Sequence, residues 1–584
     1  MSQQSTASSP RPKRAAKPAK WLERTADPDV VRRLQDDADL PAPLARVMAG
    51  RGIDADGAQP YLQPRLQQLP DPARLTGMQA AIDRLVFALK AKETVGIFGD
   101  YDVDGVTSTT LLWDVLEMLG GEVVATVPDR LVEGYGLSRA GVDRLVDGGA
   151  KLIVTVDCGV TAREEVAYAK EKGVDVIVID HHTVPVELPA AVAVINPHRH
   201  DDDSGGEHLC AVGVTFNLCL ALRRALRDQG LFTSSRPEPD LRKVMDLVAL
   251  GTVADVVPLV QENRVFVQFG LKVMARGMRI GMDALLDVAR LDRGRLASSA
   301  LGFQLGPRIN AAGRLGDAMK AVELLRSTSA PAAKRLAEQL DEENIARRDL
   351  EKRIVEQATK EIESSAEYDA ARVLVVGDED WHPGVVGIVA SRLVERFGKP
   401  CVVVGSGGRG SGRSIPKFHL HEGLVAVSST LEGFGGHAHA AGVKVGAGKL
   451  GAFRDALVAH ADEHLPAEDL GRVLLYDGDL PLEHIDEALC NVLRRAAPFG
   501  RANPEPVFRI PNVRPRAMRE LNGGHFKAVV DRRRNIEAIH FGAIERMHEF
   551  DDTIDLLAVA EINEWKGTRR VQLRVRDFRK AGDT

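Results

Sequence analysis

Three aspartates lie close together in the segment GDYDVDG, residues 99–105. Asp100, Asp102 and Asp104 follow an apolar run at 94–98, and alternate side chains of an extended chain share one face. Carboxylates at this spacing repel one another, and a divalent cation relieves the repulsion. The segment lacks the twelfth-position glutamate of an EF-hand loop, which argues against calcium. It indicates a metal site, with an ordinary acidic turn as the alternative.

Two further apolar runs, at 152–156 and 174–179, end in groups that can bind a metal. These groups are Asp157 after the first run and Asp180, His181 and His182 after the second. The carboxyl ends of parallel strands meet at one edge of a sheet, where α/β folds place their ligands. A histidine pair alone is more often structural, but beside several carboxylates it favours metal binding.

Asp255 lies in the segment ADVVPL, after another apolar run. Alone it would be interpreted as a helix cap, but it adds one more carboxylate to the set. Aspartate and histidine ligands without thiolates favour Mn²⁺ or Mg²⁺.

Five short β-branched runs alternate with amphipathic stretches in this part of the chain, a pattern typical of strands buried on both faces. The expected strands are 94–98, 123–127, 152–156, 174–179 and 192–195, and the expected helices include 106–119, 138–147 and 163–172. We predict a doubly wound parallel α/β domain.

The remaining chain divides into three further parts. Residues 205–325 are predicted to be mostly helical, and 331–365 to form a long exposed connecting helix. A second, smaller α/β unit has expected strands at 372–376 and 401–404 around a helix at 385–397. After residue 470, short alternating strands separated by turns predict a small β-barrel.

The chain has 584 residues, 44% hydrophobic and 27% charged, which is typical of a folded multidomain protein. No apolar run approaches the roughly 18 residues of a membrane span, and the first twenty residues lack the apolar core of a signal peptide. The five cysteines show no CxxC spacing, so neither a disulfide framework nor a zinc knuckle is expected. A cytoplasmic location is predicted.

Charge is unevenly placed along the chain, whose formal net charge is −6. Residues 1–24 hold six Lys and Arg against one Glu, which predicts a disordered basic tail, with a solvated terminus lacking any partner as the alternative. Residues 501–584 hold 17 Lys and Arg against 13 Asp and Glu, a net of +4. A polyanion would therefore bind through local basic surfaces.

The motifs GDYDVDG, VDCG (156–159), DHH (180–182) and ADVVPL (254–259) resemble, in this order, the four motifs of the DHH phosphoesterase superfamily. FGGHAHAAG (434–442) resembles the associated DHHA1 motif. Together with NEWKG and VQL near the C-terminus, the order is similar to that of the RecJ family of bacterial single-strand-specific 5′-to-3′ DNA exonucleases. The domains expected from this resemblance are an N-terminal helical segment (25–75), a DHH catalytic domain with a helical extension (76–330), a connecting helix (331–366), a DHHA1 substrate-binding domain (367–465) and an OB-fold β-barrel that binds single strands (466–584).

The resemblance implies a centre of two metal ions bridged by Asp157. Asp102 would serve the first ion, and the second would be held by Asp104, His181 and Asp255. The superfamily often has a histidine ligand four residues before Asp102, where this chain has Phe98, and Asp100 is the candidate replacement. His182 is expected to contact the scissile phosphate or the leaving oxygen. The catalytic residues expected are thus His182, Asp157 and Asp100. Two ions about 3.5 to 4 Å apart can produce a hydroxide near neutral pH and stabilise both oxygens of a phosphodiester that is being cut. We expect hydrolysis without a protein nucleophile, and loss of activity in a chelator.

A second site is expected in GRGSGRSIPKFHLHEG, residues 408–423, whose Gly and Ser amides can form an anion nest beside arginines. A flexible surface loop is the alternative. By resemblance, the terminal 5′-phosphate is held by Arg130, Arg314, Ser411 and Arg413. The backbone beside the scissile phosphate is expected to contact Gly435, Gly436 and His437.

The C-terminal domain is expected to bind the strand through a positive groove with aromatic stacking, as OB-folds do. Candidate contacts are Arg516, Arg519, Phe526, Lys527, Arg532, Arg533, Arg534 and Trp565. Contacts to the phosphate backbone should dominate, so that affinity falls with salt.

The resemblance implies that the substrate is single-stranded DNA with a 5′ end, released as 5′-mononucleotides in repair and recombination. Expected partners are single-strand-binding protein and recombination or repair helicases, with the enzyme itself a monomer. One alternative is another enzyme of the superfamily: a nanoRNA or cyclic dinucleotide phosphodiesterase, or a family II pyrophosphatase. The other is a non-catalytic nucleic-acid-binding module, which would have lost the motif ligands that this chain retains.

Overall fold

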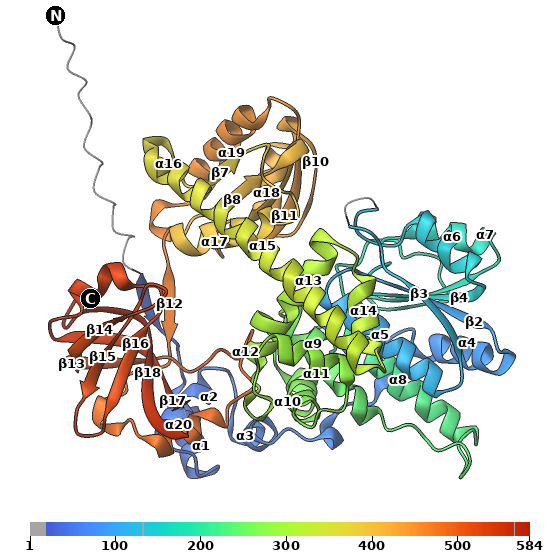
Figure 1. Cartoon of the computed structure of the whole chain (residues 1–584), viewed down its shortest axis with the longest axis horizontal. Coiled ribbons are helices and arrows are strands. Elements are labelled where there is room, and N and C mark those ends of the chain that lie inside the picture. Colours follow the sequence, from blue (N-terminus) through green and yellow to red (C-terminus); the bar gives the residue numbers. More distant parts are fainter. Residues whose placement is uncertain (1–18, 131–132, 566, 584) are drawn as a thin grey trace, which may run out of the picture. The chain divides into compact units, whose positions relative to one another are not determined.

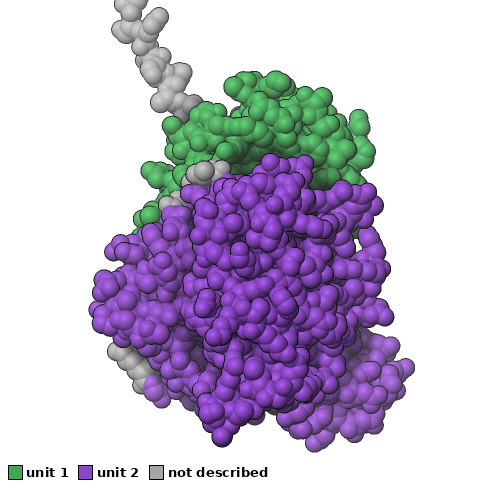
Figure 2. All heavy atoms as spheres, turned by 90° about the vertical axis from the view of Figure 1, so that its right-hand side faces the viewer, with its two compact units in different colours: residues 1–22, 345–475 green, residues 23–344, 476–584 purple. Residues whose placement is uncertain are grey.

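The computed structural model describes residues 19–130, 133–565 and 567–583 (Figure 1). The chain folds into two compact units (Figure 2): unit 1 contains residues 1–22 and 345–475, and unit 2 contains residues 23–344 and 476–584. Among the described residues, no helix combines the length and apolarity required to cross a bilayer.

Unit 2 contains a five-stranded parallel sheet in the order β3-β2-β4-β5-β6. Its strands are β2 (Thr94–Gly99), β3 (Glu122–Thr126), β4 (Ala150–Val156), β5 (Asp175–Ile179) and β6 (Ala193–Ile195). The helices around it are α4 (Met78–Ala91), α5 (Val103–Met118), α6 (Arg139–Asp147), α7 (Arg163–Glu171) and α8 (Ala211–Asp228). The predicted doubly wound domain is confirmed, and no predicted strand end differs from the observed one by more than two residues.

Apolar cores cover both faces of this sheet, and alternate residues of each strand point into one core or the other. In β4, Leu152, Val154 and Val156 join the core formed with α4, α5 and α8. Ile153, between them, joins a second core that also contains residues of α6 and α7. A strand covered on both faces has no solvent-facing positions for polar residues, which explains its continuous apolar run.

The helical part of unit 2 continues the first of these cores. Its helices are α9 (Met245–Ala254), α10 (Gln261–Ala275), α11 (Ile280–Val288), α12 (Ser298–Ala300), α13 (Gly306–Leu315) and α14 (Met319–Arg326). A single π-helical turn at Leu301–Leu305 joins α12 to α13. Three short N-terminal helices, α1 (Pro28–Asp36), α2 (Ala42–Ala49) and α3 (Ala55–Leu62), form a separate small core.

Helix α15 (Ala330–Ser364) has 35 residues and belongs to both units. The predicted long connecting helix is confirmed, but it is exposed on one face only. Ala333, Ala337 and Leu340 are buried in the core of unit 2, and Ile354, Ala358 and Ile362 in a core of unit 1. These positions recur every three to four residues, so one stripe of the helix is covered while its charged face stays in water.

Unit 1 contains a mixed five-stranded sheet in the order β10-β11-β9-β8-β7. Its strands are β7 (Leu374–Gly377), β8 (Cys401–Val404), β9 (Arg409–Arg413), β10 (Leu431–Gly436) and β11 (Ala440–Val445). The helices of this unit are α16 (Ala366–Ala370), α17 (Val386–Phe397), α18 (Leu420–Ala426) and α19 (Leu450–His464). Apolar cores lie on both faces of the sheet, as expected for a second α/β unit.

The C-terminal part is a six-stranded sheet in the order β13-β17-β18-β16-β15-β14, with helix α20 (Glu487–Arg494) beside it. Its strands are β13 (Phe508–Val513), β14 (Arg516–Leu521), β15 (His525–Asp531), β16 (Ile536–His540), β17 (Ile554–Trp565) and β18 (Thr568–Lys580). The predicted closed barrel is wrong, because β13 and β14 are both edge strands. Register shifts at 510–513 and 516–519 interrupt the regular ladder where these strands follow one another.

The predicted tail of residues 1–24 lies mostly outside the described residues. Its last part is not disordered: Lys20–Glu23 forms strand β1, which pairs with β12 (Val473–Tyr476). The apolar residues Trp21 and Leu22 interrupt the basic composition here. The backbone amide of Lys20 donates to the Arg472 carbonyl at 2.8 Å.

Candidate metal centre

The first aspartate segment connects β2 to α5 and does not stay extended. Asp100 directly follows the strand, and Asp102 caps α5 by accepting hydrogen bonds from the amides of Asp104 (2.9 Å) and Gly105 (3.1 Å). Asp104 is already in the first helical turn, so the prediction that alternate side chains share one face is wrong. Gly105 permits this tight entry, since a Cβ there would lie 2.4 Å from the Asp100 carbonyl oxygen.

The Asp104 carboxylate lies at the N-terminus of a second helix. Its two oxygens accept hydrogen bonds from the amides of Ala211 (2.7 Å) and Val212 (2.9 Å), which begin α8. Helix N-termini favour negative charge, and these bonds fix the direction of the side chain. Burial, followed by the charge of Asp102, nevertheless raises the pKa of Asp104 to about 7.

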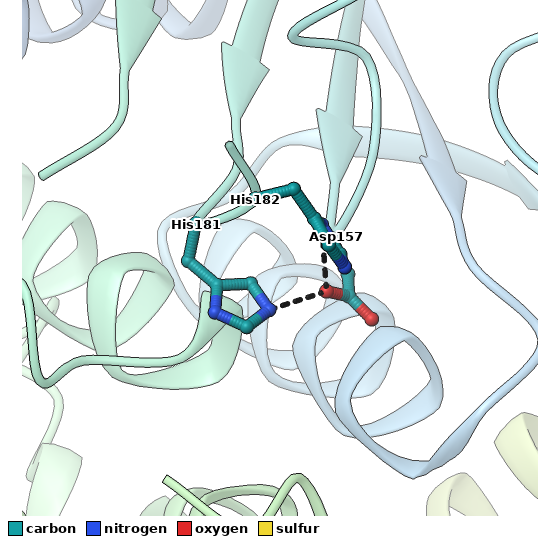
Figure 3. A group of neighbouring side chains, drawn as sticks. All are labelled: Asp157, His181 and His182. Atoms are coloured by element: carbon teal, nitrogen blue, oxygen red, sulfur yellow. Dashed lines mark ion pairs between the residues drawn. The ribbon is translucent and has the colours of Figure 1, made fainter. Parts of the chain in front are cut away.

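Asp157 lies at the centre of the cluster, directly after β4. It has a left-handed backbone (φ 65°), and only 2% of the residue is exposed. The His181 Nε2 atom lies 3.2 Å from Asp157 Oδ1, and 3.9 and 3.8 Å from the nearest carboxylate oxygens of Asp104 and Asp255. Figure 3 shows both histidine rings directed at the Asp157 carboxylate.

Asp180, which the sequence suggested as a candidate ligand, instead organises the two histidines. Its Oδ1 accepts the amides of His181 (2.8 Å) and His182 (3.1 Å), and its Oδ2 accepts the amide of Val160 (2.9 Å). Oδ1 also lies 2.8 Å from His182 Nδ1. Burial works against protonation of His182, but this hydrogen bond outweighs it and raises the pKa of the imidazole. The carboxylate thus holds the ring with Nε2 available.

Sequence reasoning missed Tyr135, which contacts the same ring. Its hydroxyl donates to the Asp157 carbonyl at 3.1 Å and lies 3.0 Å from His182 Nδ1. The residue precedes α6 and is 52% exposed. A lone tyrosine in a loop carries no sequence signal for such a contact.

Asp255 caps the C-terminus of α9 and shares its surroundings with Cys210. Ligand atoms of Asp104, Cys210 and Asp255 lie within 4.8 Å of one another. Two other groups meet this condition, Asp100 with Asp102 and Asp157, and Asp157 with His181 and His182. Asp157 belongs to both of these groups. Cys210 was not among the expected ligands, and its place at the N-terminus of α8 brings the thiol beside Asp104 and Asp255.

Three buried polar atoms of the cluster have no hydrogen-bond partner: Asp100 Oδ1, Asp157 Oδ1 and His181 Nε2. Burial, followed by repulsion from neighbouring aspartates, raises the pKa of Asp100, Asp157 and Asp255 well above the usual range. Burial, followed by the charge of His182, lowers the pKa of His181 to about 4, so that the imidazole is neutral. Unpartnered oxygens and a neutral imidazole are what a hard or borderline divalent cation requires.

We expect Mn²⁺ to stabilise the folded protein. At one hundred times Kd, the melting temperature should rise by roughly 5 °C. Because the folded-state pKa of Asp104 exceeds its unfolded value, the protonated carboxyl stabilises the metal-free fold at low pH. This stabilisation is lost as pH rises through about 7. Protons compete with the metal below that pH, so the shift should be larger at pH 8 than at pH 6. Calorimetry with and without Mn²⁺ measures it, and an equal shift in an Asp157→Asn variant would contradict this location.

Phe98 supplies no ligand. It is fully buried in the core on the α6 side of the sheet, where a Cβ added to Gly141 would lie 2.2 Å from its ring. The nearby acidic group is Asp100, whose carboxylate lies with those of Asp102 and Asp157.

Arg130 and Arg314 both lie near Tyr101, which is itself part of the acidic segment 99–105. The Arg130 guanidinium lies 5.1 Å from the centre of the Tyr101 ring. Burial and the charge of Asp100 raise the pKa of Tyr101 to about 12, and the charges of Arg130 and Arg314 oppose the rise. The structure therefore brings two of the four predicted phosphate contacts beside the metal centre.

Ser411 and Arg413 lie together in unit 1. Arg413 Nη1 donates to Ser411 Oγ at 2.9 Å, and a Cβ on Gly387, in the first turn of α17, would lie 3.0 Å from that hydroxyl. The predicted anion nest is wrong for residues 409–413, because this segment is strand β9, paired on both sides with β8 and β11. Its amides serve the sheet, so the side chains carry the candidate site.

Gly435, Gly436 and His437 lie at the hairpin between β10 and β11. The His437 amide donates to the Ala440 carbonyl at 2.8 Å, and the His437 ring makes an edge contact with His439. All three predicted residues are exposed on the surface of unit 1.

The predicted strand contacts of the C-terminal sheet divide into exposed and structural residues. Arg516, Arg519, Arg532 and Arg533 are exposed, whereas Lys527 pairs with Glu537 at 2.6 Å. Phe526, one of the candidate contacts, is fully buried in the core and does not offer its ring to bases. Arg534 binds three backbone carbonyls and Asp531, which makes it structural. The side chain of Trp565 lies outside the described part of the chain.

Comparison with family models matches three parts of the chain. Residues 94–252 match the DHH family, N-terminal domain; residues 370–462 match the DHHA1 domain; and residues 476–577 match the RecJ OB domain. Each match falls on one of the sheets described above.

Full-length relatives are similar as well. The single-stranded-DNA-specific exonuclease RecJ of Dickeya dadantii is 38% identical over 554 residues, which cover 91% of this chain and 95% of the relative. The Escherichia coli protein of the same name is 37% identical over 565 residues, covering 93% and 97%. The crystal structure of RecJ in complex with Mn²⁺ from Thermus thermophilus aligns with a TM-score of 0.81 and 29% identity, covering 97% of this chain and 80% of that one.

Proposed function

The chain belongs to the RecJ family of single-stranded-DNA-specific exonucleases, and from that premise we propose that it hydrolyses single-stranded DNA from the 5′ end, releasing 5′-mononucleotides. The observation that carries this proposal is the cluster of buried, unpartnered carboxylate and imidazole atoms around Asp157. Incubation of 5′-phosphorylated single strands with Mn²⁺ tests it. Preferential cleavage of short RNA, cyclic dinucleotides or pyrophosphate would instead support another superfamily enzyme.

Two Mn²⁺ or Mg²⁺ ions fit the donor set. One is assigned to Asp100, Asp102 and Asp157, and the other to Asp104, His181 and Asp255, with Asp157 shared. When bound, the ions would activate a water and offset phosphate charge. The protein's own part is to hold these groups in place: hydrogen bonds from α8 fix Asp104, and Asp180 fixes the His182 ring. His182 faces the substrate, where its Nε2 can contact the scissile phosphate or the leaving oxygen.

Ser411 and Arg413 of unit 1 are assigned to the 5′-phosphate, because a monoanionic or dianionic terminal phosphate suits an arginine beside a hydroxyl. Arg130 and Arg314 of unit 2 remain predicted phosphate contacts. Replacing Arg413 with Ala is expected to weaken binding of a 5′-phosphorylated strand by about tenfold, since hydrogen bonds to charged groups contribute roughly 1.5 to 3 kcal/mol. The same substitution should weaken binding of a strand with a 5′-hydroxyl much less. Fluorescence anisotropy with the two strands measures the difference.

Arg409 offers a matched control for this prediction. It lies at the start of the same strand, β9, and is exposed. Arg409→Ala should leave the preference for the 5′-phosphate unchanged. An equal loss of affinity for both strands in Arg413→Ala would mean that Arg413 supports the sheet and does not recognise the terminal phosphate.

The C-terminal sheet is assigned to the body of the strand, through exposed arginines on β14 and the β15–β16 turn. Replacing Arg516 and Arg519 with Ala should weaken binding of all sequences alike and lower the salt slope of log K by about two, one for each lost phosphate contact. Titration at several salt concentrations measures the slope, and an unchanged slope would place the strand elsewhere. Phe541, 51% exposed and packed against His525, is an aromatic surface that sequence reasoning missed.

Single-strand-binding protein and repair helicases are the partners that this assignment suggests, with action in the cytoplasm during repair and recombination. The enzyme is proposed to act as a monomer. Sedimentation of the full chain with and without single-strand-binding protein tests both points.

A further inference from the structure

The first turn of helix α10 contains three consecutive buried polar residues, Glu262, Asn263 and Arg264, none of which has a role in the chemistry described so far. Burying a polar group costs free energy unless the group is hydrogen-bonded. Arg264 donates to the carbonyl of Tyr61 at 2.9 Å and so anchors α10 to helix α3. The other two residues bear on the metal centre.

Asn263 is fully buried, and its side-chain amide joins two loops. Its Nδ2 atom donates to the carbonyl of His208 at 2.6 Å and to the carbonyl of Pro258 at 2.9 Å. A carbonyl oxygen can only accept, so both bonds require the two hydrogens of an amide nitrogen. An aspartate of the same shape would direct an oxygen at two carbonyl oxygens. The contact therefore selects an amide side chain at this position.

The first of these loops leads from His208 into the N-terminus of α8. There the amides of Ala211 and Val212 hold the Asp104 carboxylate at 2.7 and 2.9 Å. Glu262 adds a second bond to the same loop, since its Oε2 lies 2.7 Å from His208 Nε2. The first turn of α10 thus holds the loop whose end fixes Asp104.

The second loop begins at Asp255, the C-cap of α9, three residues before Pro258. Within it, Val256 has a left-handed backbone with φ 60°, which is strained for a β-branched residue. Strain of this kind persists where surrounding contacts impose it. The bond from Asn263 to the Pro258 carbonyl is one such contact. The same amide therefore bears on the loop that carries Asp255.

We propose that Asn263 is a positioning residue for the second metal ion, the one assigned to Asp104, His181 and Asp255. One amide group joins the loop that fixes Asp104 to the loop that carries Asp255, so that one cation can contact both carboxylates. Ligand atoms of these two aspartates lie within 4.8 Å of each other. The inference rests on the proposed two-ion function and adds a residue that touches neither metal nor substrate.

The experiment is a calorimetric titration of the full-length, metal-free chain with Mn²⁺, in the wild type and in Asn263→Asp. The affinity of one of the two sites should fall about ten- to hundredfold, the usual effect of losing a group that orients a metal ligand, while the other site keeps its Kd. The Mn²⁺ concentration that gives half-maximal turnover should rise by the same factor. Turnover at saturating Mn²⁺ should be restored, because Asn263 does not touch the substrate.

The His181→Ala background identifies which site is weakened, since it is expected to retain only the first ion. Adding Asn263→Asp to this background should leave the remaining Mn²⁺ affinity unchanged. Equal weakening of the remaining site would mean that Asn263 supports the fold in general. Two unchanged sites in Asn263→Asp alone would overturn the positioning role.

Asn503 is a matched control, a buried asparagine whose Nδ2 also donates to two carbonyls, those of Ala496 and Pro498, at 2.9 and 2.7 Å. Asn503→Asp should lower the melting temperature as Asn263→Asp does, but leave both Mn²⁺ sites unchanged. Should Asn263→Asp fail to fold, Asn263→Ala removes the donors without adding a carboxylate and should show the same selective loss. A wild-type chain that binds two Mn²⁺ ions but cuts no single strand would overturn the proposed exonuclease function, whereas the titrations still decide the role of Asn263.

Discussion

Replacing Asp157 with Asn is expected to lower exonuclease turnover by at least about 10³-fold, because several kcal/mol of charge stabilisation depend on the metal pair. Asp157 belongs to two of the three ligand groups, and its buried Oδ1 has no hydrogen-bond partner. An amide keeps the shape of the side chain but removes the charge that two cations would share. Release of 5′-mononucleotides from a single strand in Mn²⁺ measures the loss.

The same substitution should not unfold the protein. In the metal-free state, Asp157 is one of several buried carboxylates that repel one another, and repulsion contributes to its raised pKa. The metal-free variant should therefore melt at the wild-type temperature or above it. Asp143→Asn is the control, since Asp143 is a surface residue of α6 that contacts Lys172 and Tyr168. Normal turnover in the Asp157 variant would contradict the proposal that Asp157 is a ligand of both metal ions.

Replacing His182 with Ala is expected to lower turnover by about 10² to 10⁴-fold, the usual contribution of a positioned proton-transfer group. The ring is held by Asp180 at 2.8 Å, and its side chain is 44% exposed, whereas that of His181 is 12% exposed. An exposed imidazole in the cluster suits contact with substrate, and a buried one suits contact with metal. Single-turnover kinetics at saturating strand measures the chemical step.

Measurements of metal binding should distinguish the roles of His181 and His182. His182→Ala should keep two Mn²⁺ sites by calorimetric titration, whereas His181→Ala should lose one. Asp180→Asn should lower turnover less than His182→Ala, because it misplaces the ring without removing it. Combined with His182→Ala, it should cause little further loss, since both changes act on one group. A large additional loss would mean that Asp180 acts independently of His182.

From the sequence alone we could predict that several strand ends meet at one edge of the sheet. The apolar runs around 94–98, 152–156 and 174–179 are strands, and the polar groups after them do converge. Continuous β-branched runs are a strong signal because both faces of the sheet are covered. Three of the four superfamily motifs lie at strand ends, after β2, β4 and β5, whereas ADVVPL lies at the end of α9.

Local geometry could not be anticipated in the same way. Asp100, Asp102 and Asp104 were expected on one extended face, but α5 begins at Val103 and separates their roles. The glycine-rich segment at 409–413 was expected to be a nest, but it is a strand that pairs with β8, just before it, and with β11, further along the chain. Small residues permit both a tight loop and a crowded central strand, and only tertiary contacts distinguish them.

What the sequence determined by itself is therefore the inventory and the order: which ionisable side chains follow which strands, and that they belong to a metal-dependent phosphoesterase. Tertiary structure alone decided which partner each group has. The amides of Ala211 and Val212 hold Asp104, Cys210 joins Asp104 and Asp255, and His181 contacts Asp157. The physical reason is that strand and helix periodicities are local, whereas these contacts join α5, α8, α9 and the strand ends across longer sequence separations.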